Sequence, residues 1–329
     1  MSTASYEARR FGIHSAQSLA AAKRLCPQLV VVEPHYHIYK EVSQQIHEIF
    51  RDYTDLIEPL SLDEAFLDVT NNKRDIALAV DCAKELKARI KAETGLTASA
   101  GVSYCKLLAK IASDYRKPNG LCIIHPDRAQ EFINRLRVER IWGVGRKTAE
   151  HMHRMGIFTG VDLQRFSLEH LTKEFGKMGR LFYNFARGID ERPVITEWER
   201  KSVSCEQTFQ TDLSQPAQLT IELYHTVQEL VRRIAKAHFN GHTLTLKIKF
   251  NDFRQITRST TVNYALCTKD QILPLAKQLM SEVDYRQYPI RLIGLGVSGH
   301  HDEMLIAATP QWIQLELNFQ EYPTCTYST

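Results

Sequence analysis

The chain has 329 residues, of which 43% are hydrophobic and 24% charged, and this composition excludes disordered and collagen-like proteins. At usual domain sizes of roughly 100 to 200 residues, the length predicts two or three packed domains. Lysine and arginine number 42 and aspartate and glutamate 38, so the net charge of +4 does not by itself indicate a nucleic-acid partner.

The sequence lacks signals for membrane insertion or export. No run approaches the roughly 18 consecutive apolar residues of a membrane helix, and residues 1–10 lack the apolar core of a signal peptide. The 7 cysteines are scattered, without a CxxC pair or zinc spacing, which is typical of reduced thiols. We therefore expect a monomeric, cytoplasmic protein without a membrane partner.

The first part of the chain, up to residue 124, alternates helical and strand patterns. Small apolar residues before Cys26 recur at helical spacing, and the β-branched run within 26–35 predicts a strand. The later patterns predict a hairpin of two short strands at 57–69, a strand at 96–103, and helices at 39–53, 76–93 and 106–117. Strands alternating with helices predict an α/β sheet domain.

The second part of the chain has a different residue pattern. From Asp127 to about Gly188, glycines interrupt short helical patterns, which predicts a small helical domain. The polar segment 190–200 predicts an extended linker. From Lys201 the patterns follow the order strand, helix, strand, strand, helix, strand, and this βαββαβ order predicts a sheet with both helices on one face. The residues after about 303 are expected to form a tail.

An acidic pair, Asp63 and Glu64, lies at the predicted hairpin turn and has no obvious basic neighbour in the sequence. Two hard oxygen ligands in this position suit Mg²⁺, which takes water and substrate phosphates as its remaining ligands. An ordinary solvated turn is the other interpretation, and the dipeptide taken alone favours that turn.

Three motifs in order resemble the Y family of DNA polymerases, the lesion-bypass enzymes related to DNA polymerase IV. They are STASYEARRFGIHS at 2–15, IEPLSLDEAFLDV at 57–69 and KLLAKIASDYRKPNG at 106–120. The resemblance extends from the first residue to the tail. It implies distributive, template-directed addition of deoxynucleotides (dNTPs) to a primer 3′-hydroxyl, without a proofreading module.

The resemblance also implies roles for residues of the first part. Asp63 is expected to bridge two Mg²⁺ ions, and Glu64 to bind the ion that activates the primer hydroxyl, so both are candidate metal ligands and catalytic residues. Tyr6, Arg9 and Lys117 are expected to contact the triphosphate of the incoming dNTP. Taken singly, the two bases would be solvated surface residues and Tyr6 a half-buried aromatic residue.

The same resemblance implies a multidomain α+β protein. Its first domain would contain the palm and fingers and an incomplete sheet. The expected divisions are a fingers remnant at 1–35, the palm at 36–124, a helical thumb at 125–191, a linker at 192–200, the little finger at 201–302 and a tail at 303–329.

The thumb segment 139–157 resembles a helix-hairpin-helix, a motif whose backbone N–H groups bind the phosphates of primer-template DNA. Glycines permit its tight turn and bases add charge; the candidates are Gly143, Gly145, Arg146 and Lys147. A P-loop is excluded, because arginines stand where its first glycine and its lysine are required. A turn without a role in DNA binding, and a helix-hairpin-helix nuclease, are the other interpretations.

Basic residues also cluster in the predicted little finger, where a basic sheet face would bind a DNA backbone in a salt-dependent way. On the strands the candidates are Lys247, Lys249 and Arg254, and a solvated charged face is the alternative. The tail sequence QLELNF resembles the peptide that binds the replicative sliding clamp. Its candidate clamp-binding residues are Gln314, Leu315, Leu317 and Phe319.

The chain departs from the family at its beginning. Family members ordinarily start with a strand-helix-strand unit that supplies a third metal-binding carboxylate and a bulky side chain that excludes the ribose 2′-hydroxyl, and neither has a counterpart here. The alternative to an active polymerase is therefore a catalytically impaired, truncated form that binds only DNA and the sliding clamp.

Overall fold

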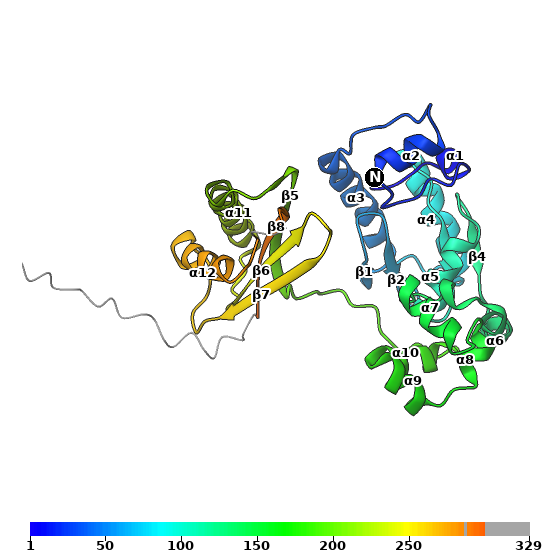
Figure 1. Cartoon of the computed structure of the whole chain (residues 1–329). Coiled ribbons are helices and arrows are strands. Elements are labelled where there is room, and N and C mark those ends of the chain that lie inside the picture. Colours follow the sequence, from blue (N-terminus) through cyan, green and yellow to red (C-terminus); the bar gives the residue numbers. More distant parts are fainter. Residues whose placement is uncertain (286–287, 300–329) are drawn as a thin grey trace, which may run out of the picture. The chain divides into compact units, whose positions relative to one another are not determined.

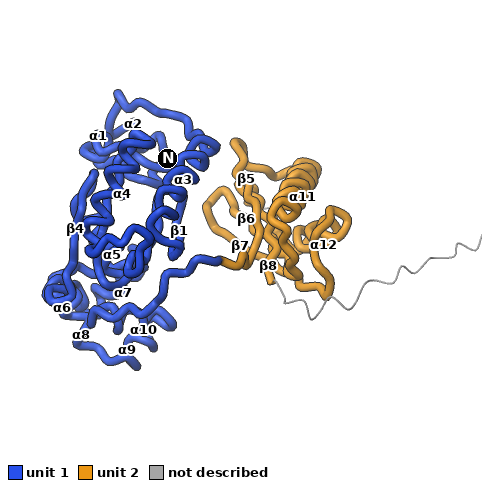
Figure 2. Tube along the Cα trace, turned by 180° about the vertical axis from the view of Figure 1, so that it is seen from behind, with its two compact units in different colours: residues 1–197 blue, residues 198–329 orange. Residues whose placement is uncertain are grey.

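The computed structural model describes residues 1–285 and 288–299, which divide into two compact units (Figure 1, Figure 2). Unit 1 comprises Met1–Glu197 and unit 2 begins at Trp198. The division falls within the segment 192–200, which the sequence predicts as a linker.

Unit 1 begins with helices α1 (Tyr6–Arg9), α2 (Leu19–Leu25) and α3 (Tyr36–Arg51). The first two start where a serine side chain accepts a backbone N–H bond, Ser5 from Ala8 and Ser18 from Ala21. Such capping satisfies one of the donors that the first turn of a helix leaves unpaired.

The strand predicted within 26–35 is wrong, because this segment contains no strand. Val30, Val31 and Val32 are 82%, 50% and 76% exposed. A strand persists where a neighbouring strand pairs its backbone groups, and in the described part of the chain none pairs with this run. The β-branched residues indicate a local preference for extended backbone. Among the described residues no neighbouring strand stabilises it.

The centre of unit 1 consists of two small sheets and two helices. Strands β1 (Ile57–Pro59) and β2 (Ala65–Leu67) form the predicted antiparallel hairpin, which is confirmed. Helix α4 (Ala79–Thr94) follows. Strands β3 (Ala100–Val102) and β4 (Leu121–Ile123) are parallel and are joined by α5 (Lys106–Tyr115), because a parallel pair needs a crossover.

Helix α5 is held tightly in place. A Cβ at Gly101 would lie 2.0 Å from the carbonyl oxygen of Ala109, so a glycine in β3 is what allows the helix to approach the strand. Leu107 and Ile111 join the apolar core of the following helices, and Leu108 packs against α6 in a further cluster. The position of α5 therefore fixes where its polar side chains lie.

The following segment is helical, as predicted, with a core that includes Val138, Met152 and Phe182. Its elements are α6 (Pro126–Arg135), the short 3₁₀ helix η1 (Val138–Arg140), α7 (Arg146–Arg154), α8 (Gly160–Gln164), α9 (Leu168–Phe175) and α10 (Lys177–Phe185).

Unit 2 has the predicted βαββαβ order, which is confirmed. Its elements are β5 (Ser202–Leu213), α11 (Pro216–Ala237), β6 (Thr243–Phe250), β7 (Gln255–Thr261), α12 (Lys269–Ser281) and β8 (Ile290–Ser298). The strands form one antiparallel sheet in the order β5-β8-β6-β7. Both helices pack on the sheet and against each other, and they cover the face from which Leu244, Leu246 and Ile248 point. Among the described residues of unit 2, no helix covers the other face, here called the open face (Figure 1).

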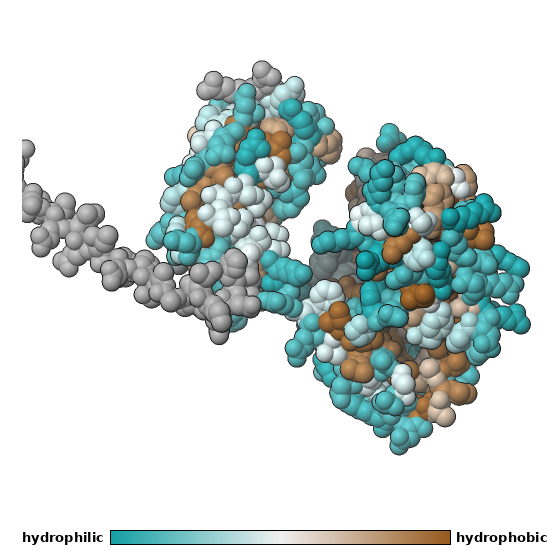
Figure 3. All heavy atoms as spheres, turned by 90° about the horizontal axis from the view of Figure 1, so that it is seen from below, coloured by the Kyte–Doolittle hydropathy of each residue, from teal (hydrophilic) through white to brown (hydrophobic). Residues whose placement is uncertain are grey.

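In the described part of the chain, none of the helices is both long and apolar enough to cross a membrane. On the face that Figure 3 shows, apolar residues lie in small patches among hydrophilic ones.

A buried ion pair joins the segment after α10 to the centre of unit 1. The ammonium of Lys106 lies 2.6 Å from Oε2 of Glu58, and the two side chains are only 8% and 4% exposed. The same ammonium donates to the carbonyl of Pro193 at 2.8 Å, and the N–H of Ile195 donates to Glu58 Oε2 at 2.8 Å. One charged pair thus ties β1, α5 and residues 193–195 together.

Replacing Lys106 with methionine should destabilise unit 1 strongly, because Glu58 would remain buried without its cation. We expect Lys106→Met to lower the free energy of unfolding of unit 1 by about 3–5 kcal/mol. The control, Lys84→Met, removes the exposed pair with Asp81 and should cost about 0.5 kcal/mol or less. Native-state hydrogen exchange of the core amides of unit 1 measures both losses, and similar losses in the two variants would contradict the assigned role.

Candidate functional site

The turn between β1 and β2 places Asp63 and Glu64 side by side. The N–H groups of Leu60 and Ser61 donate to the carbonyl of Glu64 at 2.9 and 3.2 Å, which closes the turn. Oδ1 of Asp63 accepts from the hydroxyl of Ser61 at 2.7 Å. Among the described residues Asp63 has no cationic partner, so its carboxylate remains open to a further ligand.

Glu64 has a basic neighbour, contrary to the expectation from the sequence. Nζ of Lys110 lies 2.7 Å from Glu64 Oε1. The two residues are 46 positions apart, and α5 brings them together. Lys106 and Lys110 are one helical turn apart on α5 and pair with Glu58 and Glu64 of the hairpin, and nothing in the local sequence indicates that α5 packs against the hairpin.

The segment after α5 brings a second base to the same region. Nζ of Lys117 lies 2.7 Å from Oδ1 of Asp114. The hydrogen bond to Asp114 is the main cause that raises the pKa of Lys117, and the charges of Asp114, Glu64 and Tyr6 raise it further while partial burial opposes them. Lys117 therefore lies within electrostatic range of both the acidic turn and α1.

Helix α1 carries the remaining two predicted nucleotide contacts. The guanidinium carbon of Arg9 lies 5.7 Å from the centre of the Tyr6 ring, and Arg9 Nε donates to the carbonyl of Ala4 at 3.1 Å. Since Tyr6 also acts on Lys117, residues from α1, the hairpin turn and the end of α5 meet in one region of unit 1.

The donor set here fits a divalent cation that shares its coordination with a phosphate. Among the described residues, no group of three or more His, Cys, Asp and Glu side chains lies close enough to hold a metal. The hairpin turn supplies two carboxylates. Mg²⁺ is commonly bound by one or two carboxylates together with water and substrate phosphates, and Lys117, on which Glu64 acts electrostatically, suits such phosphates.

The predicted helix-hairpin-helix turn lies between η1 and α7, so its first helix is a single 3₁₀ turn. Gly143 has φ +92°, a conformation that favours glycine. Gly145 is the N-cap of α7, with no atom within 4 Å of the position of a Cβ. Arg146 pairs with Glu150 at 2.8 Å and Lys147 is exposed. The first N–H groups of α7 are therefore accessible.

The predicted basic residues of unit 2 do not all share one face. Lys247 and Lys249 alternate with buried residues of β6 and lie on the open face, where Lys247 pairs with Glu206 at 2.7 Å. Arg254 instead stacks over the rings of Phe250, a core residue, and Tyr288, at 5.0 and 4.3 Å. The predicted clamp-binding residues Gln314, Leu315, Leu317 and Phe319 lie outside the described residues.

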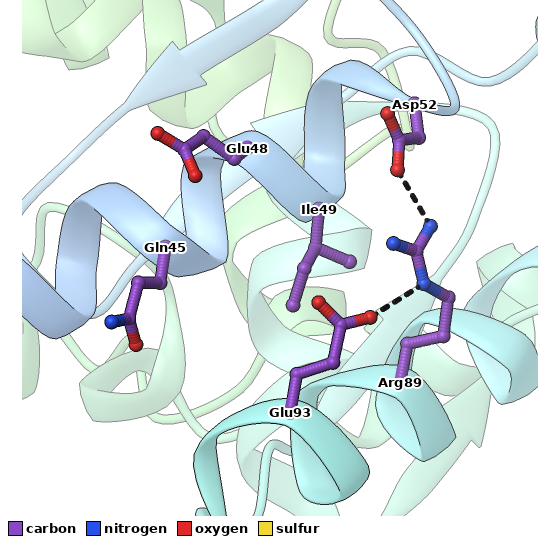
Figure 4. A pocket seen from close by; sticks show the side chains of 6 residues that line it. All are labelled: Gln45, Glu48, Ile49, Asp52, Arg89 and Glu93. Atoms are coloured by element: carbon purple, nitrogen blue, oxygen red, sulfur yellow. Dashed lines mark hydrogen bonds and ion pairs between the residues drawn. The ribbon is translucent and has the colours of Figure 1, made fainter.

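A separate surface hollow of about 350 Å³ lies between α3 and α4 (Figure 4). Arg89 lies at its wall, 2.9 Å from both Glu93 and Asp52, and hydrogen bonds to Glu93, Tyr53 and Asp52 raise the pKa of Arg89. Its lining consists of Gln45, Glu48, Ile49, Asp52, Arg89 and Glu93, and it includes none of the predicted site residues.

The position of Lys117 can be tested through its pKa. Asp114→Asn removes the main cause of the raised pKa, so the pKa of Lys117 should fall toward the ordinary lysine value. Glu64→Gln should lower it by less, because Glu64 acts only through its charge. NMR titration of ¹³C-labelled lysine side chains measures both changes, and Asp81→Asn is the control that should leave Lys117 unaffected. An unchanged Lys117 pKa in both variants would contradict the arrangement.

Comparisons with known families match three parts of the chain. The impB/mucB/samB family matches residues 1–114, and its C-terminal domain matches residues 200–314. The thumb domain of DNA polymerase-iota matches residues 139–190. These segments include the acidic turn, the helix-hairpin-helix turn and the sheet of unit 2.

Similar proteins and solved structures give the same assignment. DNA polymerase IV of Bacteroides fragilis (strain YCH46) is 56% identical over 322 residues, which cover 98% of this chain and 88% of that protein. DNA polymerase IV of Akkermansia muciniphila is 51% identical over 317 residues, which cover 96% and 88%. A Y-family DNA polymerase chimera, Dbh-Dpo4(243-245)-Dbh, has a TM-score of 0.81 at 27% identity, with 90% of this chain and 86% of the chimera covered. An insertion ternary complex of Dbh DNA polymerase has a TM-score of 0.57 at 26% identity, with 89% and 85% covered. The chain therefore belongs to the Y family of DNA-directed DNA polymerases.

Proposed function

We propose that the protein is a translesion DNA polymerase of the DNA polymerase IV type, which transfers nucleotides from dNTPs to a primer 3′-hydroxyl in a Mg²⁺-dependent reaction. The observation that carries the proposal is that the hairpin turn places Asp63 and Glu64 side by side, with Lys110 of α5 2.7 Å from Glu64 and Lys117 in the segment that follows the same helix. Acids that suit a divalent cation and bases that suit phosphates are what nucleotidyl transfer requires in one place.

In this proposal Asp63 and Glu64 are the residues that would hold two Mg²⁺ ions. When bound, the ions would lower the pKa of the primer hydroxyl and neutralise charge on the triphosphate and the departing pyrophosphate. Tyr6 donates its hydroxyl hydrogen to a phosphate oxygen, and Arg9 and Lys117 contribute positive charge. Lysine is protonated at neutral pH at its ordinary pKa, and the hydrogen bond to Asp114 raises the pKa of Lys117 further.

The primer-template duplex would be held mainly through its phosphates. The accessible N–H groups at Gly145 and the start of α7, together with Arg146 and Lys147, suit one backbone contact. Lys247 and Lys249 on the open face of unit 2, with Arg254 at its edge, suit another. Backbone contacts carry no sequence information and weaken as salt rises, which is consistent with distributive synthesis on any template.

A second candidate function is a form that binds DNA without extending a primer. The observation that favours it is the donor set, because the described residues provide two neighbouring carboxylates and no larger metal-binding group. A carboxylate already paired with Lys110 is also a weaker ligand than a free one.

Primer extension by the full chain separates the two candidates. We expect incorporation with Mg²⁺, and Asp63→Ala should slow it about 100-fold or more, because several kcal/mol of transition-state stabilisation would be lost. Binding of the primer-template, measured by fluorescence anisotropy, should change little in the same variant. DNA binding without any extension by the unaltered chain would refute the catalytic proposal.

We also propose that the tail binds the replicative sliding clamp through Gln314, Leu315, Leu317 and Phe319. An extended peptide with alternating apolar side chains can dock into an apolar groove, and tethering raises the effective concentration of the enzyme at primer ends.

A double variant in which Gln314 and Leu315 are both changed to alanine should lose clamp binding, as measured by surface plasmon resonance. Its extension of short templates should stay intact. Replacing Thr326 and Ser328 with alanine in the same tail is the control. Unchanged clamp affinity in the first variant would remove this part of the proposal.

A further inference from the structure

We propose that Lys110 is a positioning residue that makes divalent-cation binding at the acidic turn depend on the nucleotide. In the absence of nucleotide its ammonium neutralises Glu64 and competes with a divalent cation for that carboxylate. This inference rests on the proposed function, because it assumes that Asp63 and Glu64 bind the cation.

The pair between Lys110 and Glu64 is close and partly shielded. The 2.7 Å separation is that of a charge-assisted hydrogen bond, and the side chains of Lys110 and Glu64 are 18% and 38% exposed. Bulk water screens such a pair less than a fully exposed one. Lys110 therefore acts on Glu64 more strongly than a surface lysine would.

The backbone of Lys110 is fixed in place because helix α5 is fixed in place. The close approach at Gly101 and the buried pair between Lys106 and Glu58 hold α5 against β3 and the hairpin. Only the side chain of Lys110 is free to change partner, and its flexible stem can turn toward another anion.

A divalent cation at Glu64 would therefore have an ammonium group as a close neighbour. Like charges repel, so the free cation should bind more weakly than the two carboxylates alone would allow. A triphosphate bound at Arg9 and Lys117 would bring several negative charges, offset that repulsion and offer Lys110 a new anionic partner. Binding of the cation and of the nucleotide would then be positively coupled, and such coupling is reciprocal.

A purely structural role for the pair makes a different prediction. If Lys110 only fastened the hairpin to α5, its replacement would lower thermal stability and leave cation affinity unchanged or reduced. The competition proposed here requires that removing the positive charge increases the affinity for a free cation.

The experiment is a titration of the full chain with Mn²⁺, followed by electron paramagnetic resonance, without nucleotide and with a non-hydrolysable dNTP analogue. Without nucleotide, Lys110→Met and Lys110→Gln should each bind Mn²⁺ about tenfold more tightly than the unaltered chain. Lys110→Arg, which keeps the charge, should resemble the unaltered chain, and so should Lys84→Met. With the analogue present, the difference between these proteins should shrink.

Further variants distinguish a failure of the proposed role of Lys110 from a failure of the proposed metal site. Asp63→Ala combined with Lys110→Met should lose the tight site, which shows that the gained affinity belongs to the acidic turn. Equal or weaker Mn²⁺ binding by both neutral Lys110 variants, with Asp63→Ala still weakening the site, would overturn the role of Lys110 and leave the proposed function standing. Mn²⁺ binding that is insensitive to Asp63→Ala, with or without the analogue, would overturn the metal site itself and the inference with it.

Discussion

The pairing of carboxylates on the β1–β2 hairpin with lysines on α5 determines where the candidate site forms. Lys106 neutralises Glu58 inside unit 1, at 2.6 Å, and Lys110 meets Glu64 one helical turn later. Burial of the first pair is tolerable because each charge also makes a backbone hydrogen bond, to Pro193 and from Ile195. The second pair is less deeply buried, with side chains 18% and 38% exposed, and the flexible stem of Lys110 can turn toward another anion. One helix thus supplies a structural contact and an exchangeable one.

The same helix connects the site to the rest of unit 1. Its apolar residues pack into the cores of the helices that follow, and its C-terminal end leads to Lys117, which lies within range of Glu64 and Tyr6. A displacement of α5 would therefore move the acidic turn and Lys117 relative to each other. In this account unit 2 contributes affinity for DNA through its open sheet face, and the chemistry depends on unit 1 alone.

Local patterns predicted much of this arrangement. The hairpin at 57–69, the helical segment after Asp127 and the βαββαβ order of unit 2 follow from periodicity and turn residues, and the structure confirms them. The strand within 26–35 failed because strand formation depends on a partner that local sequence does not reveal. The partner of Glu64 was missed for a similar reason, since Lys110 is distant in sequence and only the packing of α5 brings it close. Arg254 looked like the strand lysines in sequence, yet it stacks on Phe250 and Tyr288.

We propose that a divalent cation bound by Asp63 and Glu64 lies close to Tyr6 and Lys117, which contact the triphosphate. Paramagnetic broadening of NMR signals by Mn²⁺ tests it most directly, because broadening falls steeply with distance from the ion. Mn²⁺ with a dNTP analogue should broaden the signals of Tyr6 and Lys117, and Asp63→Ala should remove the effect. Signals of Tyr6 and Lys117 that stay sharp, or broadening that persists in Asp63→Ala, would contradict the proposal.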